Sequence, residues 1–265
     1  MLGQPLTGSA ARRRLRANDV PFLILARGIA SGGGPSAMAE IGGRPLLWHI
    51  ILSYSRCGFR RFVIGLSDGA DDIGRFVADG SQDSDLDDGL SVDLISAGGS
   101  TATGGCIRRL ADHLGPSTFI LARADALSDV DPRDLLAFHR SHGRLATMLA
   151  VRPPARFGRL ALVGDTVVEF AEKPRQEDEW ISGGLFVLER GAFDYLPADD
   201  TPLENEPLER LAQDGQLMAC RHDSFWLRLD TPRDRLLLER LWGAGQAPWV
   251  VRGRGGAPEE KRSYE

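Results

Sequence analysis

The sequence is poor in lysine, in cysteine and in long apolar runs. Lysine occurs only as Lys173 and Lys261, so almost all positive charge comes from arginine. Three scattered cysteines (Cys57, Cys106 and Cys220) form no disulfide framework and indicate a reducing compartment, so we expect a cytoplasmic protein. No apolar run approaches the length of a membrane span, and the N-terminal arginines are not followed by the apolar region of a signal peptide. We therefore expect no membrane partner.

Composition and charge narrow the class of protein. The chain is 42% hydrophobic and 26% charged, which is ordinary for a globular protein. Its formal net charge of −5 argues against a nucleic-acid partner, because proteins that bind nucleic acid carry a basic surface. We expect a flexible arginine-rich segment over residues 1–18, a single domain over 19–251 and a disordered polar tail over 252–265.

Short apolar runs separated by helical patterns predict the fold. Buried strands are expected at residues 22–26, 61–66 and 118–122, a half-buried strand at 90–96, and further strands at 145–151 and 183–188. Helices are expected from residue 46 to near 57–58 and over residues 71–78, 107–114, 132–142, 206–213 and 231–241. Short strands with a turn at Gly164–Asp165 are expected between 156 and 170. This alternation predicts an α/β fold with a mostly parallel mixed sheet, residues 22–26 at its centre and helices on both faces.

Two glycine segments are candidates for binding a nucleotide. Gly28 and the run 32–34 follow the strand that ends at Ala26, and the helix after them has Pro45 in its first turn. Strand, glycine loop and helix in this order present backbone N–H groups to a phosphate. The second segment, Thr103–Gly105, permits close backbone approach and precedes a helix that offers free N–H groups. Read locally, it is a glycine turn before a helix.

Two aspartates are candidates for holding a metal. Asp125 follows the buried run 118–122, where ligands of open α/β sheets bind. Asp230 precedes Thr231 and Pro232 at the start of the last helix. Two hard carboxylates from distant segments can share one Mg²⁺ that also bridges phosphates. The local alternatives are a turn capped by Asp125 and a helix N-cap at Asp230 or Thr231.

Several segments in one order resemble the sugar-1-phosphate nucleotidyltransferases, and in particular the glucose-1-phosphate cytidylyltransferases. The matching segments are PSAM and EIGGRPLLWHI (35–50), TATGGC (101–106), TFILARADALSDVD (118–131), RFG (156–158), EKP (172–174), WISGGLFVL (180–188) and FWLRLDTPRD (225–234). With the opening strand and further matches at 134–147, 204–211 and 239–250, the resemblance runs from about residue 21 to 250. Many short matches in one order are far more specific than any single motif.

The resemblance implies a Rossmann-like nucleotidyltransferase fold and the reaction of CTP with glucose-1-phosphate to CDP-glucose and pyrophosphate. It implies Mg²⁺ on Asp125 and Asp230, with Lys173 as the third catalytic residue. It places the nucleotide on Ala26, Gly28, Ser36, Thr103, Gly104 and Gly105, and the sugar phosphate on Glu172, Lys173, Ser182 and Gly183. A lysine is a compact point charge suited to a phosphate monoester.

The signature loop departs from the family pattern. Residues 27–32 replace the family's GGxGTR, Ser36 replaces a lysine, and Cys106 also stands where a cation is expected. Losing one preorganised electrostatic stabiliser costs about 10²–10³ in rate, so losing two costs on the order of 10⁴ or more if they act independently. From a typical rate of ~10 s⁻¹ this leaves ~10⁻³ s⁻¹ or slower. We therefore expect impaired activity, unless Arg27 or Arg44 replaces the lost charges.

Two other functions remain open on the sequence. A catalytically inactive homologue would keep the fold for a binding or regulatory role, and the missing loop cations favour it. A glycosyltransferase would use Asp129 and Asp131 as an Asp-x-Asp metal motif, but the nucleotidyltransferase family carries the same aspartates. Homo-oligomer formation is also left open.

Overall fold

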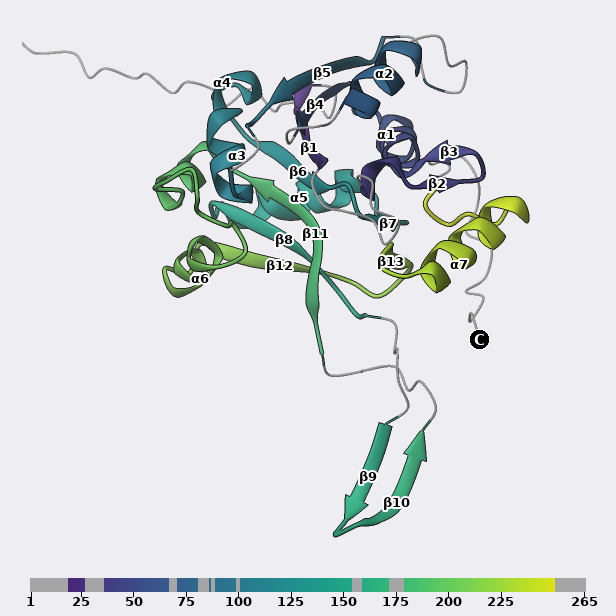
Figure 1. Cartoon of the computed structure of the whole chain (residues 1–265). Coiled ribbons are helices and arrows are strands. Elements are labelled where there is room, and N and C mark those ends of the chain that lie inside the picture. The colour runs from purple at the N-terminus through teal and green to yellow at the C-terminus, as the bar shows by residue number, and fades with distance from the viewer. Residues whose placement is uncertain are drawn as a thin grey trace, which may run out of the picture.

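A seven-stranded mixed sheet forms the centre of the molecule (Figure 1). The computed structural model describes residues 19–26, 36–66, 71–80, 86, 89–98, 101–153, 159–171 and 179–250. The strand order is β12-β8-β11-β6-β1-β4-β5. In chain order these strands are β1 (Phe22–Ala26), β4 (Arg61–Leu66), β5 (Ser91–Ser96), β6 (Phe119–Arg123), β8 (Ala146–Val151), β11 (Ile181–Leu188) and β12 (Leu217–His222). Within this described sheet, β11 alone runs antiparallel to its neighbours.

The predicted fold class is confirmed. Every residue of β1 is buried, and β1 pairs in parallel with β4 on one side and β6 on the other. A strand covered on both faces has no polar side, which is why its sequence is a continuous apolar run. Because β1, β4 and β6 run the same way, their carboxyl ends meet at one edge of the sheet.

Helices cover both faces of the sheet. Phe22 and Ile24 of β1 belong to one hydrophobic cluster, and Leu23 and Leu25 belong to the other, because successive strand residues point to opposite faces. The first cluster includes residues of α1 (Leu46–Arg56), α2 (Asp71–Gly80), α5 (Pro132–His142) and α7 (Pro232–Gly243). The second includes residues of α3 (Thr103–Arg109), α4 (Ala111–Leu114), η3 (Arg190–Tyr195) and α6 (Glu206–Gln213). Among the helices described, none has the length and apolar character needed to cross a membrane.

Local sequence signals set the ends of two helices. Asp131 caps α5 by accepting a hydrogen bond from the Arg133 backbone N–H, and Gly143 ends the helix in the left-handed region at φ +66°. Thr231 caps α7 and forms a capping box with Asp234. Thr231 therefore takes the N-cap position that the sequence had left open between Thr231 and Asp230.

The start of α3 differs from the prediction. A helix was expected from Ile107 after a glycine turn, but α3 begins at Thr103 and includes both glycines. A Cβ on Gly105 would lie 2.0 Å from the backbone oxygen of Asp199, so the absence of a side chain lets another segment pack directly against this turn. The glycines thus serve a backbone contact inside the helix, which no local pattern reveals.

Three two-stranded ribbons complete the described fold. They are β2 (Glu40–Ile41) with β3 (Arg44–Pro45), β7 (Ala126–Ser128) with β13 (Trp226–Arg228), and β9 (Arg159–Val163) with β10 (Thr166–Ala171). The last is the hairpin predicted from the Gly164–Asp165 turn, and it extends away from the sheet in Figure 1. The β7–β13 ribbon has the greatest consequence, because it joins the segment after β6 to the segment before α7.

Protein stability should fall when the pH falls below about 6.5. His49 is fully buried; its Nε2 donates to the Ile41 carbonyl at 2.9 Å, and its Nδ1 accepts from Trp249 Nε1 at 3.3 Å. Burial lowers the pKa of His49 below its ordinary value of 6.5. The unfolded chain therefore binds a proton that the folded chain resists, so the stability is complete above pH 6.5 and is lost as the pH falls toward the folded pKa.

Urea unfolding at about pH 7.5 and about pH 5 measures this loss. The control is His49→Gln, which has no titrating ring. It should be less stable at the higher pH but should lose less stability between the two. An equal loss in both proteins would assign the pH dependence to other groups, including His142, whose pKa burial also lowers.

Candidate active site

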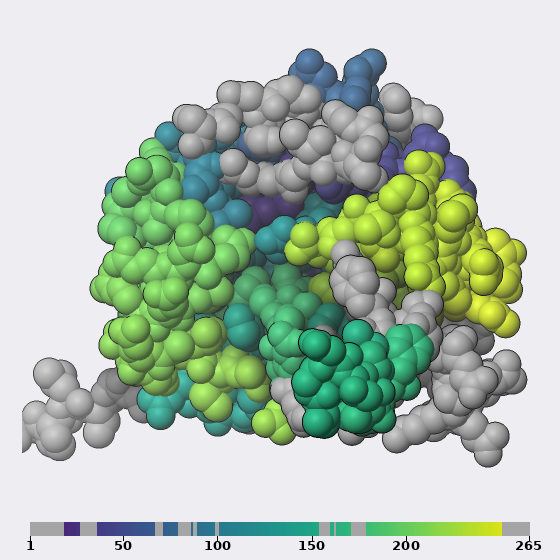
Figure 2. All heavy atoms as spheres, turned by 60° about the horizontal axis from the view of Figure 1, so that its bottom comes forward, coloured from purple at the N-terminus to yellow at the C-terminus, as the bar shows by residue number. Residues whose placement is uncertain are grey.

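A cleft of about 140 Å³ lies at the carboxyl-end edge of the sheet. It opens on the hollowed face shown in Figure 2, between the green region of η3 and α6 and the yellow region of α7. The residues that line it come from β6, β11, β13 and the segments beside them: Arg123, Asp125, Ser182, Gly183, Gly184, Phe186, Glu204, Trp226 and Arg228. The cleft thus collects charged side chains from segments far apart in the sequence.

Asp125 stands just past the carboxyl end of β6, as the sequence predicts. It is 8% exposed. Its backbone carbonyl accepts from the Leu229 N–H at 2.8 Å, and the N–H of the preceding Ala124 donates to the Leu25 carbonyl at 3.1 Å. Asp125 is therefore fixed between the central strand β1 and the segment that follows β13.

The structure brings Asp125 and Asp230 together. In the antiparallel β7–β13 ribbon, Arg228 at the end of β13 lies opposite Ala126 at the start of β7. The Arg228 Nε is 2.6 Å from Asp230 Oδ1 and 3.8 Å from Asp125 Oδ2. These two carboxylate oxygens are separated by no more than the sum of the two distances. This upper limit allows one hydrated Mg²⁺ to contact both carboxylates directly or through its waters, because Mg²⁺ commonly keeps several waters and takes one or two protein carboxylates.

The donor chemistry fits a magnesium ion that also contacts phosphates. Asp125 and Asp230 supply hard oxygen ligands. Over the described residues, no group of three or more His, Cys, Asp or Glu side chains could hold a metal by itself. A metal here would complete its coordination with substrate and water, which is the usual arrangement at phosphoryl-transfer sites.

Each of these carboxylates is paired with an arginine two positions earlier. Arg123 Nη2 lies 2.6 Å from Asp125 Oδ2, and its Nε lies 3.1 Å from the same oxygen. Arg228 donates to Asp230 Oδ1 through its Nε at 2.6 Å. Burial opposes the charge on Arg123, yet hydrogen bonds and charges of Asp125 and Glu204 leave the pKa of this guanidinium raised. The sequence analysis had assigned no role to Arg123, which stands where the resembling family has a tyrosine.

The candidate sugar side of the cleft is a distorted part of β11. The register between β11 and β8 shifts between Ser182 and Phe186, and Gly184 has φ +75°. The Gly183 carbonyl accepts from the Trp226 Nε1 at 2.9 Å. Ser182 and Gly183 therefore line the cleft as expected, with Trp226 as a wall residue that the sequence had not singled out.

The candidate base segment is closed by backbone hydrogen bonds. Ala102 N–H donates to Asp199 O at 2.9 Å and Gly104 N–H donates to Thr201 O at 3.0 Å. The expectation of free N–H groups at this helix start is therefore wrong for these two, because the segment after η3 supplies their acceptors. Thr103 Oγ1 donates to Glu204 Oε2 at 2.5 Å. Cys106 is fully buried, which accounts for an uncharged residue there.

The structure describes only part of the candidate phosphate-binding set. Ala26 is the last residue of β1, at the same sheet edge as Asp125, and Ser36 is a buried residue at the start of η2 (Ser36–Met38). Gly28, Glu172 and Lys173 lie outside the described residues, as do Arg27 and the RFG segment at 156–158.

Asp129 and Asp131 have structural partners outside the cleft. Asp129 accepts from Ser224 Oγ at 2.5 Å and lies 2.8 Å from His222 Nε2. Asp131 caps α5 and pairs with Arg133 at 2.6 Å. Neither carboxylate lines the cleft. The geometry gives no support to an Asp-x-Asp metal site.

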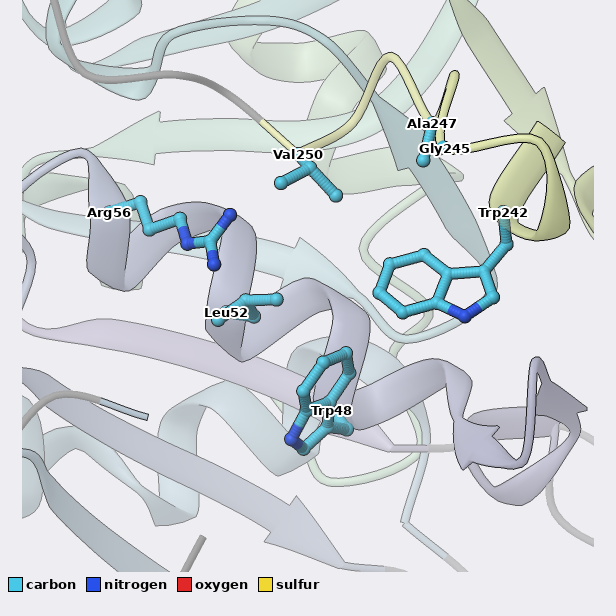
Figure 3. A pocket seen from close by; sticks show the side chains of 7 residues that line it. All are labelled: Trp48, Leu52, Arg56, Trp242, Gly245, Ala247 and Val250. Carbon is cyan, nitrogen blue, oxygen red and sulfur yellow. The ribbon is translucent and has the colours of Figure 1, made fainter. Parts of the chain in front are cut away.

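A second hollow, of about 350 Å³, lies between α1 and the C-terminal segment (Figure 3). In this view Trp48, Leu52 and Arg56 come from α1 and face Trp242, Ala247 and Val250 across the opening. Among the described residues that line this hollow, Arg56 is the single charged one. The hollow and the cleft have no described lining residue in common. It offers no acid, base or metal ligand for chemistry.

Comparison with known proteins gives a consistent family. The Nucleotidyl transferase family model matches residues 33–234. Glucose-1-phosphate cytidylyltransferase of Salmonella typhi is 37% identical over 232 residues, covering 81% of this chain and 90% of that protein. The Bacillus subtilis (strain 168) protein named "Probable glucose-1-phosphate cytidylyltransferase" is 33% identical over 233 residues, covering 82% and 91%.

The fold has a matching solved structure. HddC from Yersinia pseudotuberculosis, complexed with GMP-PN, superposes with a TM-score of 0.66 at 23% sequence identity and covers 84% of this chain and 99% of that one. The fold, the order of the site segments and the family match agree: the chain belongs to the nucleotidyl transferase family.

Proposed function

We propose that this protein is a glucose-1-phosphate cytidylyltransferase, which joins CTP and glucose-1-phosphate to give CDP-glucose and pyrophosphate. The observation that carries the proposal is the placement of Asp125 and Asp230 on one arginine at the carboxyl-end edge of the sheet. Relatives with that name, at 37% and 33% identity, support the choice of base and sugar. The cytoplasmic location expected from the cysteines stays a prediction.

The proposed residue roles follow the cleft. Asp125 and Asp230 would hold Mg²⁺, which supplies positive charge to the phosphates and orients them. Lys173 and Glu172 would bind the sugar phosphate, beside Ser182 and Gly183 of the β11 wall. Thr103 would border the base, while Gly104 and Gly105 would hold the start of α3 against the 199–201 segment, and Ala26, Gly28 and Ser36 would border the phosphates.

The reaction asks the chain for positioning and charge. A sugar-phosphate oxygen attacks the α-phosphorus of the triphosphate, the bond to the β-phosphate oxygen breaks, and pyrophosphate leaves. No protein nucleophile is required. The rate therefore depends on holding the attacking oxygen in line with the α-phosphorus and the leaving pyrophosphate, and on stabilising negative charge. This dependence makes the cations around the phosphates the decisive residues.

We expect measurable binding of glucose-1-phosphate, weak binding of CTP, and a turnover of ~10⁻³ s⁻¹ or slower, because the signature loop lacks two cations of the family. Calorimetric titration with CTP, other nucleoside triphosphates and glucose-1-phosphate, with and without Mg²⁺, measures the binding. Pyrophosphate release measures the turnover. A turnover of several per second with CTP would show that other groups have replaced the lost cations.

The same expectation is tested in reverse by restoring the charges. Ser36→Lys together with Gly32→Arg should tighten CTP binding by about tenfold or more and raise pyrophosphate release, since each charge would face phosphate oxygens in a partly desolvated loop. Ser36 is only 6% exposed, so Ser36→Met with Gly32→Arg is the matched control for side-chain size. Equal effects of lysine and methionine would attribute the change to packing.

An inactive homologue is the second candidate, and the missing loop cations favour it. It predicts that CTP and glucose-1-phosphate bind without pyrophosphate release, and that the restored loop produces none either. Release in the restored variant would instead identify an impaired enzyme.

A further inference from the structure

The same three-residue unit occurs twice at the cleft: Arg123, Asp125 and Arg228 line it, and Asp230 lies beside Arg228. In Arg123-Ala124-Asp125 and Arg228-Leu229-Asp230, an arginine ends a strand and pairs with the aspartate two positions later. The shortest contacts in the two units are both 2.6 Å. The strands β6 and β13 are distant in sequence. The aspartates that follow them, Asp125 and Asp230, are the two candidate metal ligands. The unit therefore places one guanidinium beside each metal carboxylate.

The arginines and a metal compete for the same oxygens. Asp125 Oδ2 lies 2.6 Å from Arg123 Nη2 and 3.8 Å from Arg228 Nε. A divalent cation on this oxygen would repel two guanidinium groups at close range, in a part of the protein where screening by water is reduced. Metal binding therefore requires at least one of the arginines to leave its carboxylate.

The released arginines have room to turn within the cleft. Their side chains are 35% and 45% exposed, whereas the side chain of Asp125 is 11% exposed. A Cβ on Gly184 would lie 3.2 Å from Arg123 Cδ, so this glycine in the distorted part of β11 leaves space for the arginine stem. Among the described residues that line the cleft, Arg123 and Arg228 are the two cations.

A guanidinium freed here has a natural new partner. Its planar donors match phosphate oxygens in pairs, and charge-assisted hydrogen bonds are about twice as strong as neutral ones. Ser36 stands where the family carries a lysine for the phosphates. The loop therefore lacks two phosphate cations of the family, whereas the cleft carries two cations, Arg123 and Arg228, to which the family pattern assigns no role.

We propose that Arg123 and Arg228 are phosphate-binding residues, which neutralise Asp125 and Asp230 in the empty cleft and transfer to the triphosphate when Mg²⁺ takes the carboxylates. The identity of the nucleotide rests on the function proposed above. The exchange couples the binding of the two ligands. The metal alone binds weakly, because it displaces arginines that then gain no partner. The triphosphate alone binds weakly, because the arginines are paired with Asp125 and Asp230. Bound together, each ligand strengthens the other by the same factor.

The test measures separately the two roles proposed for each arginine, which are competition with the metal and binding of phosphate. In Arg123→Met and Arg228→Met, Mn²⁺ alone, counted by electron paramagnetic resonance, should bind about tenfold more tightly, because a competing charge is gone. Pyrophosphate and CTP at saturating Mg²⁺ should bind about tenfold or more weakly by calorimetry. Arg123→Lys, which keeps the charge but not the planar fork, should restore part of the phosphate affinity.

Arg133→Met is the matched control. Arg133 pairs with Asp131 across the same spacing, with a 2.6 Å contact and side-chain exposures of 36% and 13%, but the pair lies outside the cleft. It should change neither Mn²⁺ nor phosphate affinity. Thermal melting of every variant reports whether it is folded.

The outcomes are distinguishable. Opposite shifts in metal and phosphate affinity support the proposal, whereas weaker binding of both, or no change in Mn²⁺ affinity, overturns it and leaves the arginines a structural role. If the wild type binds pyrophosphate but not CTP, the function proposed above fails while the metal and pyrophosphate measurements still decide this inference.

Discussion

Gly105→Ala should destabilise the protein by about 3 kcal/mol or more, or prevent folding. The new Cβ would lie 2.0 Å from the Asp199 backbone oxygen and 2.5 Å from its carbonyl carbon. Neither the helix nor the facing segment can yield by turning a side chain, because both contacts are with backbone. Urea unfolding of the two proteins, monitored by circular dichroism, gives the difference in the free energy of unfolding.

A second helical glycine provides the control. Gly74 lies in α2, and a Cβ there would meet nothing within 4 Å. Gly74→Ala should stabilise the protein by about 0.5–1 kcal/mol, the usual gain from replacing glycine in an open helical position. Opposite signs would show that the close approach at Asp199 is the cause. A Gly105→Ala protein as stable as the wild type would mean that the 199–203 segment does not pack against α3 in this way.

Asp125→Asn should lower turnover by a further factor of about 10²–10³ and abolish most of the Mn²⁺ affinity. The amide keeps the shape of the carboxylate but removes the charge that would hold a metal beside the phosphates. Radiolabelled CDP-glucose formation is measured in the Ser36→Lys, Gly32→Arg background, where turnover is expected to be highest, and Mn²⁺ binding is measured in the otherwise unchanged protein.

Asp131→Asn is the control for that prediction. Asp131 also pairs with an arginine at 2.6 Å, and it caps α5. Its loss should reduce stability by about 1 kcal/mol or less, because asparagine is also a good N-cap, and should leave Mn²⁺ affinity unchanged. Equal metal binding by Asp125→Asn and wild type would remove Asp125 from the proposed metal site.

Much of the candidate site was accessible from local sequence. Asp125 follows a buried run, and Ser182 and Gly183 stand in a segment that resembles a known family motif. Arg123 and Arg228 were missed, although the repeated Arg-x-Asp spacing was a usable signal. Arg123 replaces a tyrosine of the family motif, and Arg228 falls on a position that its motif leaves variable. Only a comparison of the two motifs with each other shows that both candidate metal ligands carry the same neighbour.

The base segment shows the opposite limit. The pattern Thr103–Gly105 suggested close backbone approach, which is correct, but the approaching group is the protein's own segment at Asp199 and Thr201. Glycine removes a steric barrier without specifying what will occupy the space. A sequence signal of this kind cannot distinguish a ligand from another part of the chain.

The sequence by itself determined the buried strands, the starts of α5 and α7 beside Pro132 and Pro232, and the position of Asp125 after β6. These depend on burial along short runs and on side chains that bond to backbone a few residues away. Only the tertiary structure decided that Asp125 and Asp230 share Arg228, and that Glu204 joins Arg123 to Thr103. Contacts between side chains of distant segments depend on strand order, register and side-chain direction together, and a displacement of a few ångströms in any of them would separate the charges.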